Sequence, residues 1–111
     1  MSDRELLELA AKAAGIRINH WVYDDLDYSP AVLEAGGTWH PLTDDGDALR
    51  LAVKLGLDVE MHGGNSTHPY VCAFDCERNI AEEVQPEDGD PYAATRRAIV
   101  RAAAEIGRNM K

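Results

Sequence analysis

Three segments of the chain carry apolar residues at every third or fourth position, which is the spacing of one face of an α-helix. The first segment predicts a helix over residues 2–14, because a capping-box sequence opens it and Gly15 can adopt the left-handed conformation that ends a helix. The second predicts a helix over residues 44–55, which a glycine also closes. The third predicts a helix over residues 91–107 that begins at a proline, where a missing N–H costs nothing. The residues expected on the apolar face of this third helix are Tyr92, Thr95, Ile99, Ala102, Ala103 and Ile106.

Between these helices the pattern changes to the alternation that is typical of β-strands. Residues 16–40 predict a first hairpin region, with a strand in "IRINHWVY" and a tight turn at the glycine pair of "AVLEAGGTWHPL". Residues 57–75 predict a second hairpin. In "LDVEMH" the alternation sets a polar face against an apolar face that includes Met61, and "YVCAF" is apolar on both faces and therefore central. Residues 77–90 are expected to form a polar loop, with a short strand near residues 80–84 as an alternative.

The order α-ββ-α-ββ-α with short links predicts a single α+β domain, in which a mainly antiparallel sheet carries packed helices. A chain of 111 residues is long enough to bury one core. No apolar run approaches the roughly 20 residues of a membrane span, and the first residues lack the basic and apolar regions of a signal peptide. Because two cysteines give no disulfide framework, we expect a cytoplasmic protein.

The net charge of -9 is distributed unevenly along the chain. Residues 91–111 carry a net charge of +4, and the preceding ninety residues carry -13. The overall negative charge repels polyphosphate, so nucleic acid is not an expected partner.

Arginines at positions 97, 101 and 108 fall on one side of the third predicted helix. They could contact an anion or nucleic acid, as the basic final helix of a double-stranded-RNA-binding domain does. We favour a solvated face, because Arg101 can pair with Glu105 and no cationic cluster elsewhere completes a basic surface. Trp21 and Trp39 are likewise interpreted as core or rim aromatics rather than as a platform for stacking bases.

The acidic stretch "TDDGD" directly precedes the apolar stripe of the second predicted helix. A calcium loop needs oxygen ligands at alternate positions and a distal glutamate, whereas Asp44 and Asp45 are adjacent and residues 48–57 contain no acid. Capping explains the stretch fully, because Thr43 or Asp44 can accept the free N–H groups and the following acids meet the positive end of the helix dipole. We therefore interpret these aspartates, including Asp47, as a helix start signal.

His62, His68, Cys72 and Cys76 place four potential zinc ligands within fifteen residues. The segment lacks a C-x2-C pair, and two cysteines four apart on a strand lie about 13 Å from each other. We favour a core position for Cys72, a loop thiol at Cys76 and surface histidines, and metal binding or nucleophilic catalysis here is the less favoured alternative. The acidic loop Asp24–Pro30 is interpreted as solvated rather than as a calcium site.

Three stretches, "RELLELAAKAAGI", "WHPLTDDGDALRLAVKLGL" and "GDPYAATRRAIVRAAAEIG", resemble the phage ABA sandwich domain family of small phage and prophage proteins. The resemblance covers the three predicted helices, which make up about half of the chain. It implies an α/β/α three-layer sandwich, with helices on both faces of the sheet, and a bacterial cytoplasm during phage infection or lysogeny. It implies no activity, cofactor or catalytic residue.

No catalytic constellation or cofactor motif is recognisable in the sequence, so we expect a non-enzymatic phage or prophage accessory protein without a cofactor. We expect it to act by binding an unidentified protein, with a homodimer as one form, and we expect no membrane association. One alternative is an acidic DNA mimic that inhibits a nucleic-acid-binding protein of host or phage. The other is a metal-dependent enzyme that uses the His/Cys segment.

Overall fold

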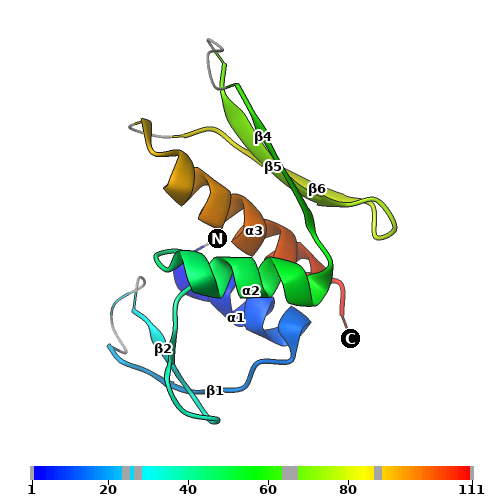
Figure 1. Cartoon of the computed structure of the whole chain (residues 1–111). Helices are drawn as coiled ribbons and strands as arrows, with labels where there is room; N and C mark the ends of the chain where they lie inside the picture. Colours follow the sequence, from blue (N-terminus) through cyan, green and yellow to red (C-terminus); the bar gives the residue numbers. More distant parts are fainter. Residues whose placement is uncertain (1, 24–25, 27–28, 64–67, 87–88, 111) are drawn as a thin grey trace.

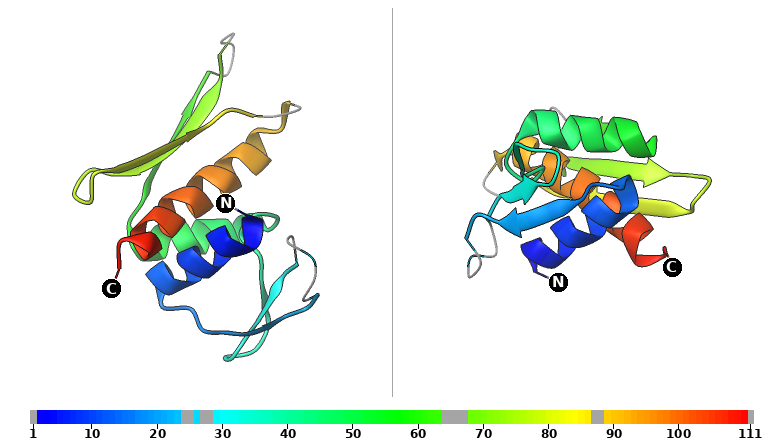
Figure 2. Two further views of the ribbon diagram at one scale, coloured as in Figure 1. Left: turned by 180° about the vertical axis from the view of Figure 1, so that it is seen from behind. Right: turned by 90° about the horizontal axis from the view of Figure 1, so that it is seen from below.

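The computed structural model describes residues 2–23, 26, 29–63, 68–86 and 89–110. The helices are α1 (Asp3–Ala14), α2 (Asp45–Leu55) and α3 (Pro91–Arg108), and the strands are β1 (Ile18–Trp21), β2 (Ala31–Leu33), β3 (Thr38–Trp39), β4 (Asp58–His62), β5 (Tyr70–Asp75) and β6 (Ile80–Val84). The strands form two separate antiparallel sheets, in the orders β1-β2-β3 and β4-β5-β6. The three helices lie between these two sheets (Figures 1 and 2).

The α+β class is confirmed, with antiparallel strands and helices packed on sheets. The layer order differs from the α/β/α arrangement that the family resemblance implied, because the strands are divided between two sheets and the helices form the middle layer (Figure 2). The physical reason lies in α3, which packs against α1, α2 and the β4-β5-β6 sheet together. Its many alanines allow close approach from several sides, so it becomes the centre of the core rather than the cover of a sheet.

Among the described residues each strand region contains three strands, so the observed order is α-βββ-α-βββ-α. The segment 77–90, expected as a polar loop, includes β6, which was the alternative for that segment. This strand forms because Ile80 and Val84 are buried while the intervening residues are exposed or half-buried. The central position predicted for "YVCAF" is confirmed, since β5 pairs with β4 on one side and with β6 on the other.

The predicted ends of the helices are confirmed by local geometry. The Ser2 hydroxyl accepts the N–H of Glu5 at 3.1 Å, and the Asp90 carboxylate accepts two N–H groups of the first turn of α3. Gly15 and Gly56 end α1 and α2 with φ angles of +69° and +67°. These positive values favour glycine, because a side chain at such φ angles meets steric strain.

Helices α1 and α3 are in very close contact. A methyl group at Gly107 of α3 would lie 2.0 Å from the carbonyl oxygen of Leu9 in α1, so only glycine fits there. Buried alanines on both helices continue this contact.

The apolar stripe expected on the third helix, which included Tyr92 and Thr95, is only partly correct. Tyr92 is 68% exposed, because it lies in the first turn of α3 and lines an open groove.

Candidate functional site

An open groove of about 320 Å³ lies where α2, α3 and β4 meet. Leu49 of α2, Met61 of β4 and Tyr92 of α3 contribute apolar side chains from three different elements, and Ile99 lines it from the second half of α3. A second hollow of about 520 Å³ shares Met61 with this groove and continues beneath the ends of β4 and β5. We call the first of these hollows the α2-α3-β4 groove.

The α2-α3-β4 groove gathers apolar side chains that face solvent. Leu49, Met61 and Tyr92 are 64%, 71% and 68% exposed. They are three of the seven large hydrophobic side chains that are exposed in the described part of the chain, and all three line this one groove. Val53, which is 73% exposed, follows Leu49 by one turn on α2. Contiguous apolar surface of this kind marks binding sites in folded proteins, whereas single exposed apolar residues are common.

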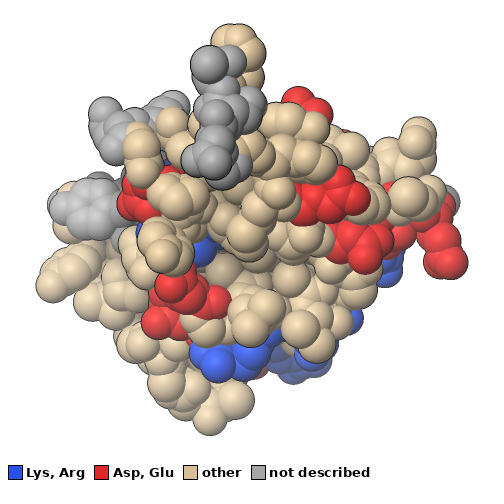
Figure 3. All heavy atoms as spheres, turned by 45° about the horizontal axis from the view of Figure 1, so that its top comes forward, with Lys and Arg blue, Asp and Glu red and all other residues tan. Residues whose placement is uncertain are grey.

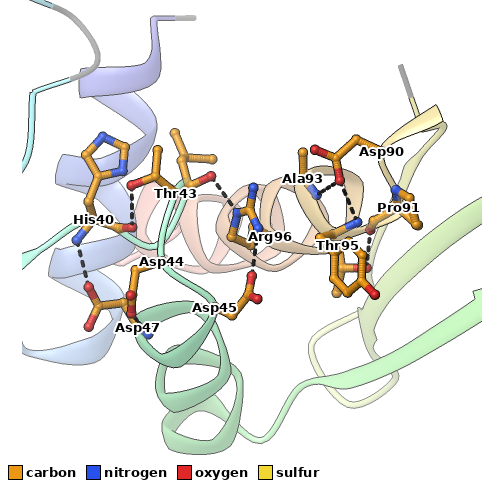
Figure 4. A network of polar contacts seen from close by, with 12 residues as sticks. His40, Thr43, Asp44, Asp45, Asp47, Asp90, Pro91, Ala93, Thr95 and Arg96 are labelled. Carbon is orange, nitrogen blue, oxygen red and sulfur yellow. Dashed lines mark hydrogen bonds and ion pairs between the residues drawn. The ribbon is translucent and has the colours of Figure 1, made fainter. Parts of the chain in front are cut away.

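The three aspartates of "TDDGD" lie at the start of α2, one of the elements that line the groove (Figure 4). Asp44 caps α2 as predicted, because its carboxylate accepts the N–H of Asp47 at 2.8 Å. The carboxylate of Asp47 in turn accepts the N–H of His40 at 2.9 Å, which ties the preceding loop to the helix. These contacts confirm the interpretation as a helix start signal, and they add a tertiary role that the sequence did not indicate.

Asp45 links α2 to α3 across the end of the groove. Its carboxylate lies 2.6 Å from the guanidinium of Arg96, and both residues line the groove (Figure 4). Arg96 also donates from Nε to the carbonyl of Leu42 at 2.8 Å. Its side chain is 16% exposed, so this arginine is a fixed structural contact and the groove retains a neutral, paired polar end.

The β4-β5-β6 sheet beside the groove is strongly acidic. Its strands contain five carboxylates and no lysine or arginine, and the acids are Asp58, Glu60, Asp75, Glu82 and Glu83. On the side of the molecule shown in Figure 3, acidic side chains form separate groups with uncharged surface between them. Any ligand that reaches this sheet therefore meets local negative charge.

The His/Cys segment does not come together as a ligand set. His62 lies against Glu60, with 2.8 Å between Nε2 and Oε2, and its ring stacks on Tyr70 at 4.4 Å. Cys72 is half-buried on β5, and Cys76 is exposed in the turn that follows. Within the ranges that the structure describes, no three or more His, Cys, Asp or Glu side chains are grouped as metal ligands. His68 is exposed and completes no such group among these residues.

Cys72 lies between two carboxylates, because it is in register with Glu60 of β4 and Glu83 of β6. Burial and then the negative charges of Glu83 and Glu60 raise the pKa of its thiol. A raised pKa lowers the thiolate fraction at neutral pH, so Cys72 is poorly suited to nucleophilic chemistry.

The arginine face of α3 consists largely of paired side chains. Arg97 contacts Asp3 of α1 at 3.2 Å, and Arg108 contacts Glu105 at 3.4 Å. The ion pair expected between Arg101 and Glu105 is replaced by this second contact, and Arg101 is exposed. Arg101 and Arg108 are exposed to solvent, as expected, whereas Arg97 also links α3 to α1.

The tryptophans and the acidic loop complete the predicted candidates. Trp39 is buried in the core, and Trp21 is half-buried beneath the guanidinium of Arg4, 4.8 Å from its ring centre. Both are core or rim aromatics, as expected. Four residues of the predicted acidic loop Asp24–Pro30, at positions 24, 25, 27 and 28, lie outside the described residues, so the interpretation of that loop stays a prediction.

The groove was not predictable from the sequence pattern. The spacing of apolar residues puts Met61 and Tyr92 on the apolar faces of their elements and leaves Leu49 outside the stripe of its helix. One signal was present: Leu49 and Val53 lie outside the stripe of Ala48, Leu51, Ala52 and Leu55, so α2 has apolar residues on a second side.

Comparisons of the chain with protein-family models, with curated protein sequences and with solved structures gave no match. In the part of the chain that the structure covers, no helix combines the length and apolarity needed to cross a membrane.

Proposed function

We propose that this protein is a non-enzymatic binding module and that the α2-α3-β4 groove receives an apolar polypeptide segment of a partner protein. The observation that carries the proposal is the exposure of Leu49, Met61 and Tyr92 in one groove. Three separate elements supply these side chains, so the groove has a defined shape only in the folded protein. The family resemblance supplies the proposed setting, a bacterial cell during phage infection or lysogeny.

The expected strength of such binding follows from the apolar area. Complete burial of a large apolar side chain contributes about 1.5–3 kcal/mol, and these side chains have roughly two thirds of their surface available. Three of them therefore supply about 3–6 kcal/mol, before the loss of translational and rotational freedom on association. Apolar contacts in the groove alone support weak binding, so a specific partner needs further contacts nearby.

DNA mimicry is the less favoured function. A mimic needs carboxylates in a regular array on one face, whereas several acids here are committed to ion pairs. Asp3, Asp45 and Asp47 all lie against arginines. On the side of the molecule shown in Figure 3, the acidic side chains lie in separate groups.

A selection from random short peptides tests the proposed groove. Peptides displayed on a library are enriched on the immobilised protein and then titrated by fluorescence anisotropy against wild type, Leu49→Asp and Val22→Asp. Both substituted side chains are exposed, and Val22 lies outside the groove, so the second variant controls for the same chemical change. We expect enriched peptides to lose affinity about tenfold in Leu49→Asp, which corresponds to about 1.4 kcal/mol, and to bind Val22→Asp normally.

The proposal fails if no peptide is enriched, or if the enriched peptides bind both variants as well as they bind wild type. Light scattering of the unliganded protein addresses the homodimer. A dimer that Leu49→Asp dissociates and Val22→Asp preserves would identify a second copy, rather than a different protein, as the groove's occupant.

A further inference from the structure

We propose that the partner segment binds as an additional β-strand on the free edge of β4, and that it alternates apolar and basic residues. This inference rests on the proposed function and names the chemistry of the partner. The segment's apolar side chains enter the α2-α3-β4 groove, and its basic side chains lie on the opposite face, beside the carboxylates of β4.

The first observation is the position of β4 in its sheet. It is an end strand, so one of its edges has no neighbour among the described strands. The sheet rests on α3 mainly through β5 and β6, and β4 contacts α3 least. Figure 1 shows β4 leaving the end of α2 and diverging from it. The sheet thus ends before it covers α2, and one more strand beside β4 would lie over the groove between them.

The second observation is the direction of the side chains along β4. Met61 is in register with Val71 and Val84, which are buried toward α3, so Met61 belongs to the inner face and lines the groove. Because neighbouring residues of a strand alternate between faces, Glu60 and Asp58 belong to the outer face. A strand paired with β4 follows the same alternation, so a residue opposite Met61 points into the groove and its neighbour points outward.

The third observation is charge. The added strand's outward residues would lie about 4.5–5.5 Å from Asp58 and Glu60, measured between Cβ atoms. Glu60 retains a 54% exposed side chain in spite of its contact with His62, so it is accessible to a second cation. Since β4, β5 and β6 contain no lysine or arginine, no side chain of those types on these strands competes with the basic residues of the added strand for Asp58 and Glu60.

The same charges disfavour a second copy of this chain as the occupant. Antiparallel pairing of two β4 strands would bring Asp58 and Glu60 of both copies onto one face, and like charges across strands are destabilising. Charged residues on an edge strand also prevent self-association in general, which accounts for these two acids. That protective role does not explain the exposed Met61, Leu49 and Tyr92 beside the edge. Strand addition accounts for these three apolar residues and for the two acids.

Four fluorescein-labelled peptides of equal length serve as probes. The first alternates valine and lysine, and the second alternates valine and glutamate. The third contains the residues of the first in two blocks, so that it keeps composition and charge but loses the alternation. The fourth is the first peptide with alternate backbone nitrogens methylated, which removes N–H donors and leaves the side chains unchanged. Anisotropy titrations at low salt compare their affinities for the full chain, and amide chemical shifts locate the bound probe.

We expect the valine–lysine peptide to bind and the other three to bind at least about tenfold more weakly, since each has lost one component of the contact. Glu60→Lys should reverse the preference in favour of the valine–glutamate peptide. The control variant Glu34→Lys makes the same charge change in the turn between β2 and β3 and should preserve the original preference. Amide shifts should change along β4 in the wild-type complex.

The inference is overturned if the methylated peptide binds as tightly as its parent, or if Glu60→Lys leaves the charge preference unchanged. It is also overturned if none of the probes binds. If these results occur while display-selected peptides still depend on Leu49, the groove binds its partner in another way and the proposed function stands. If the affinity of the display-selected peptides does not depend on Leu49 either, the proposed function is refuted as well.

Discussion

Gly107→Ala should strongly destabilise this protein, although alanine is normally the better helix former. In the interior of a helix, glycine to alanine gains roughly 0.5–1 kcal/mol. At Gly107 the added methyl group would lie 2.0 Å from the carbonyl oxygen of Leu9, an atom of the backbone that cannot rotate away. Ordinary contact begins at 3.4 Å, so α1 and α3 must separate locally by roughly 1.4 Å.

The magnitude follows from what this separation disturbs. The contact between α1 and α3 is built from buried small residues, which leave little room for compensating side-chain movement. Overpacking of a close-packed core typically costs about 1–3 kcal/mol, and a backbone clash belongs at the upper end of this range. After the gain in helix propensity is subtracted, we expect a net loss of about 2 kcal/mol, or a fall in Tm of about 8 °C.

Guanidinium unfolding followed by far-UV circular dichroism measures this loss, with equal m-values as the check that the unfolding transition is unchanged. Gly46→Ala is the matched control, because it makes the same substitution in the first turn of α2. Its added methyl group would approach only the ends of the Arg50 and Asp44 side chains, at 3.2 Å. The control should therefore change the free energy of unfolding by less than about 0.5 kcal/mol. If Gly107→Ala unfolds at the wild-type midpoint or above it, the close contact between α1 and α3 is refuted.

Three further predictions concern capping, acid stability and thiol reactivity. Asp44→Ala removes the cap of α2 and should lower the free energy of unfolding by about 1 kcal/mol, measured by the same denaturation. Burial acts to raise the pKa of Asp75. Hydrogen bonds from the Arg78 side chain and from the backbone N–H groups of Arg78 and Glu77 outweigh burial and hold this pKa below its usual value. The ionised carboxylate therefore stabilises the fold above the unfolded pKa near 3.9, and this stabilisation is lost as pH falls through the folded pKa. Asp75→Asn should accordingly make the free energy of unfolding less dependent on pH below about pH 4. Cys72 should react with a chromogenic disulfide reagent more slowly than Cys76 at mildly alkaline pH. Glu83→Gln should increase the reaction rate of Cys72 and leave that of Cys76 unchanged. Equal rates for the two thiols in the wild-type protein would contradict the raised pKa of Cys72.

Local rules explain why the helices were predictable from the sequence. Each helix begins at a residue whose side chain accepts free N–H groups, and α1 and α2 end at glycines with positive φ. The turn at Gly36 and Gly37 was predictable for the same reason, since both residues have positive φ angles. These features depend on a few neighbouring residues, so the chain itself contains the information for them.

The candidate site was predictable only in part. The sequence located the start of α2 at Asp44, but the bond from Asp47 to the backbone of His40 and the ion pair between Asp45 and Arg96 depend on how segments meet in the fold. Met61 illustrates the limit most clearly. Its place on the apolar face of an alternating strand predicted a buried residue, yet it is 71% exposed, because β4 is an end strand that contacts α3 less than β5 and β6 do.

The sequence by itself thus determined the helices, most of the strands, the α+β class and the helix-capping role of the aspartates. Only the tertiary structure decided that the strands form two sheets, that the helices lie between them, and that α2, α3 and β4 leave an apolar groove open. The physical reason is the separation along the chain of the residues that must come into contact. Caps and turns are set by contacts between residues close in the chain, whereas strand partners and layer order depend on which distant surfaces bury the most apolar area together.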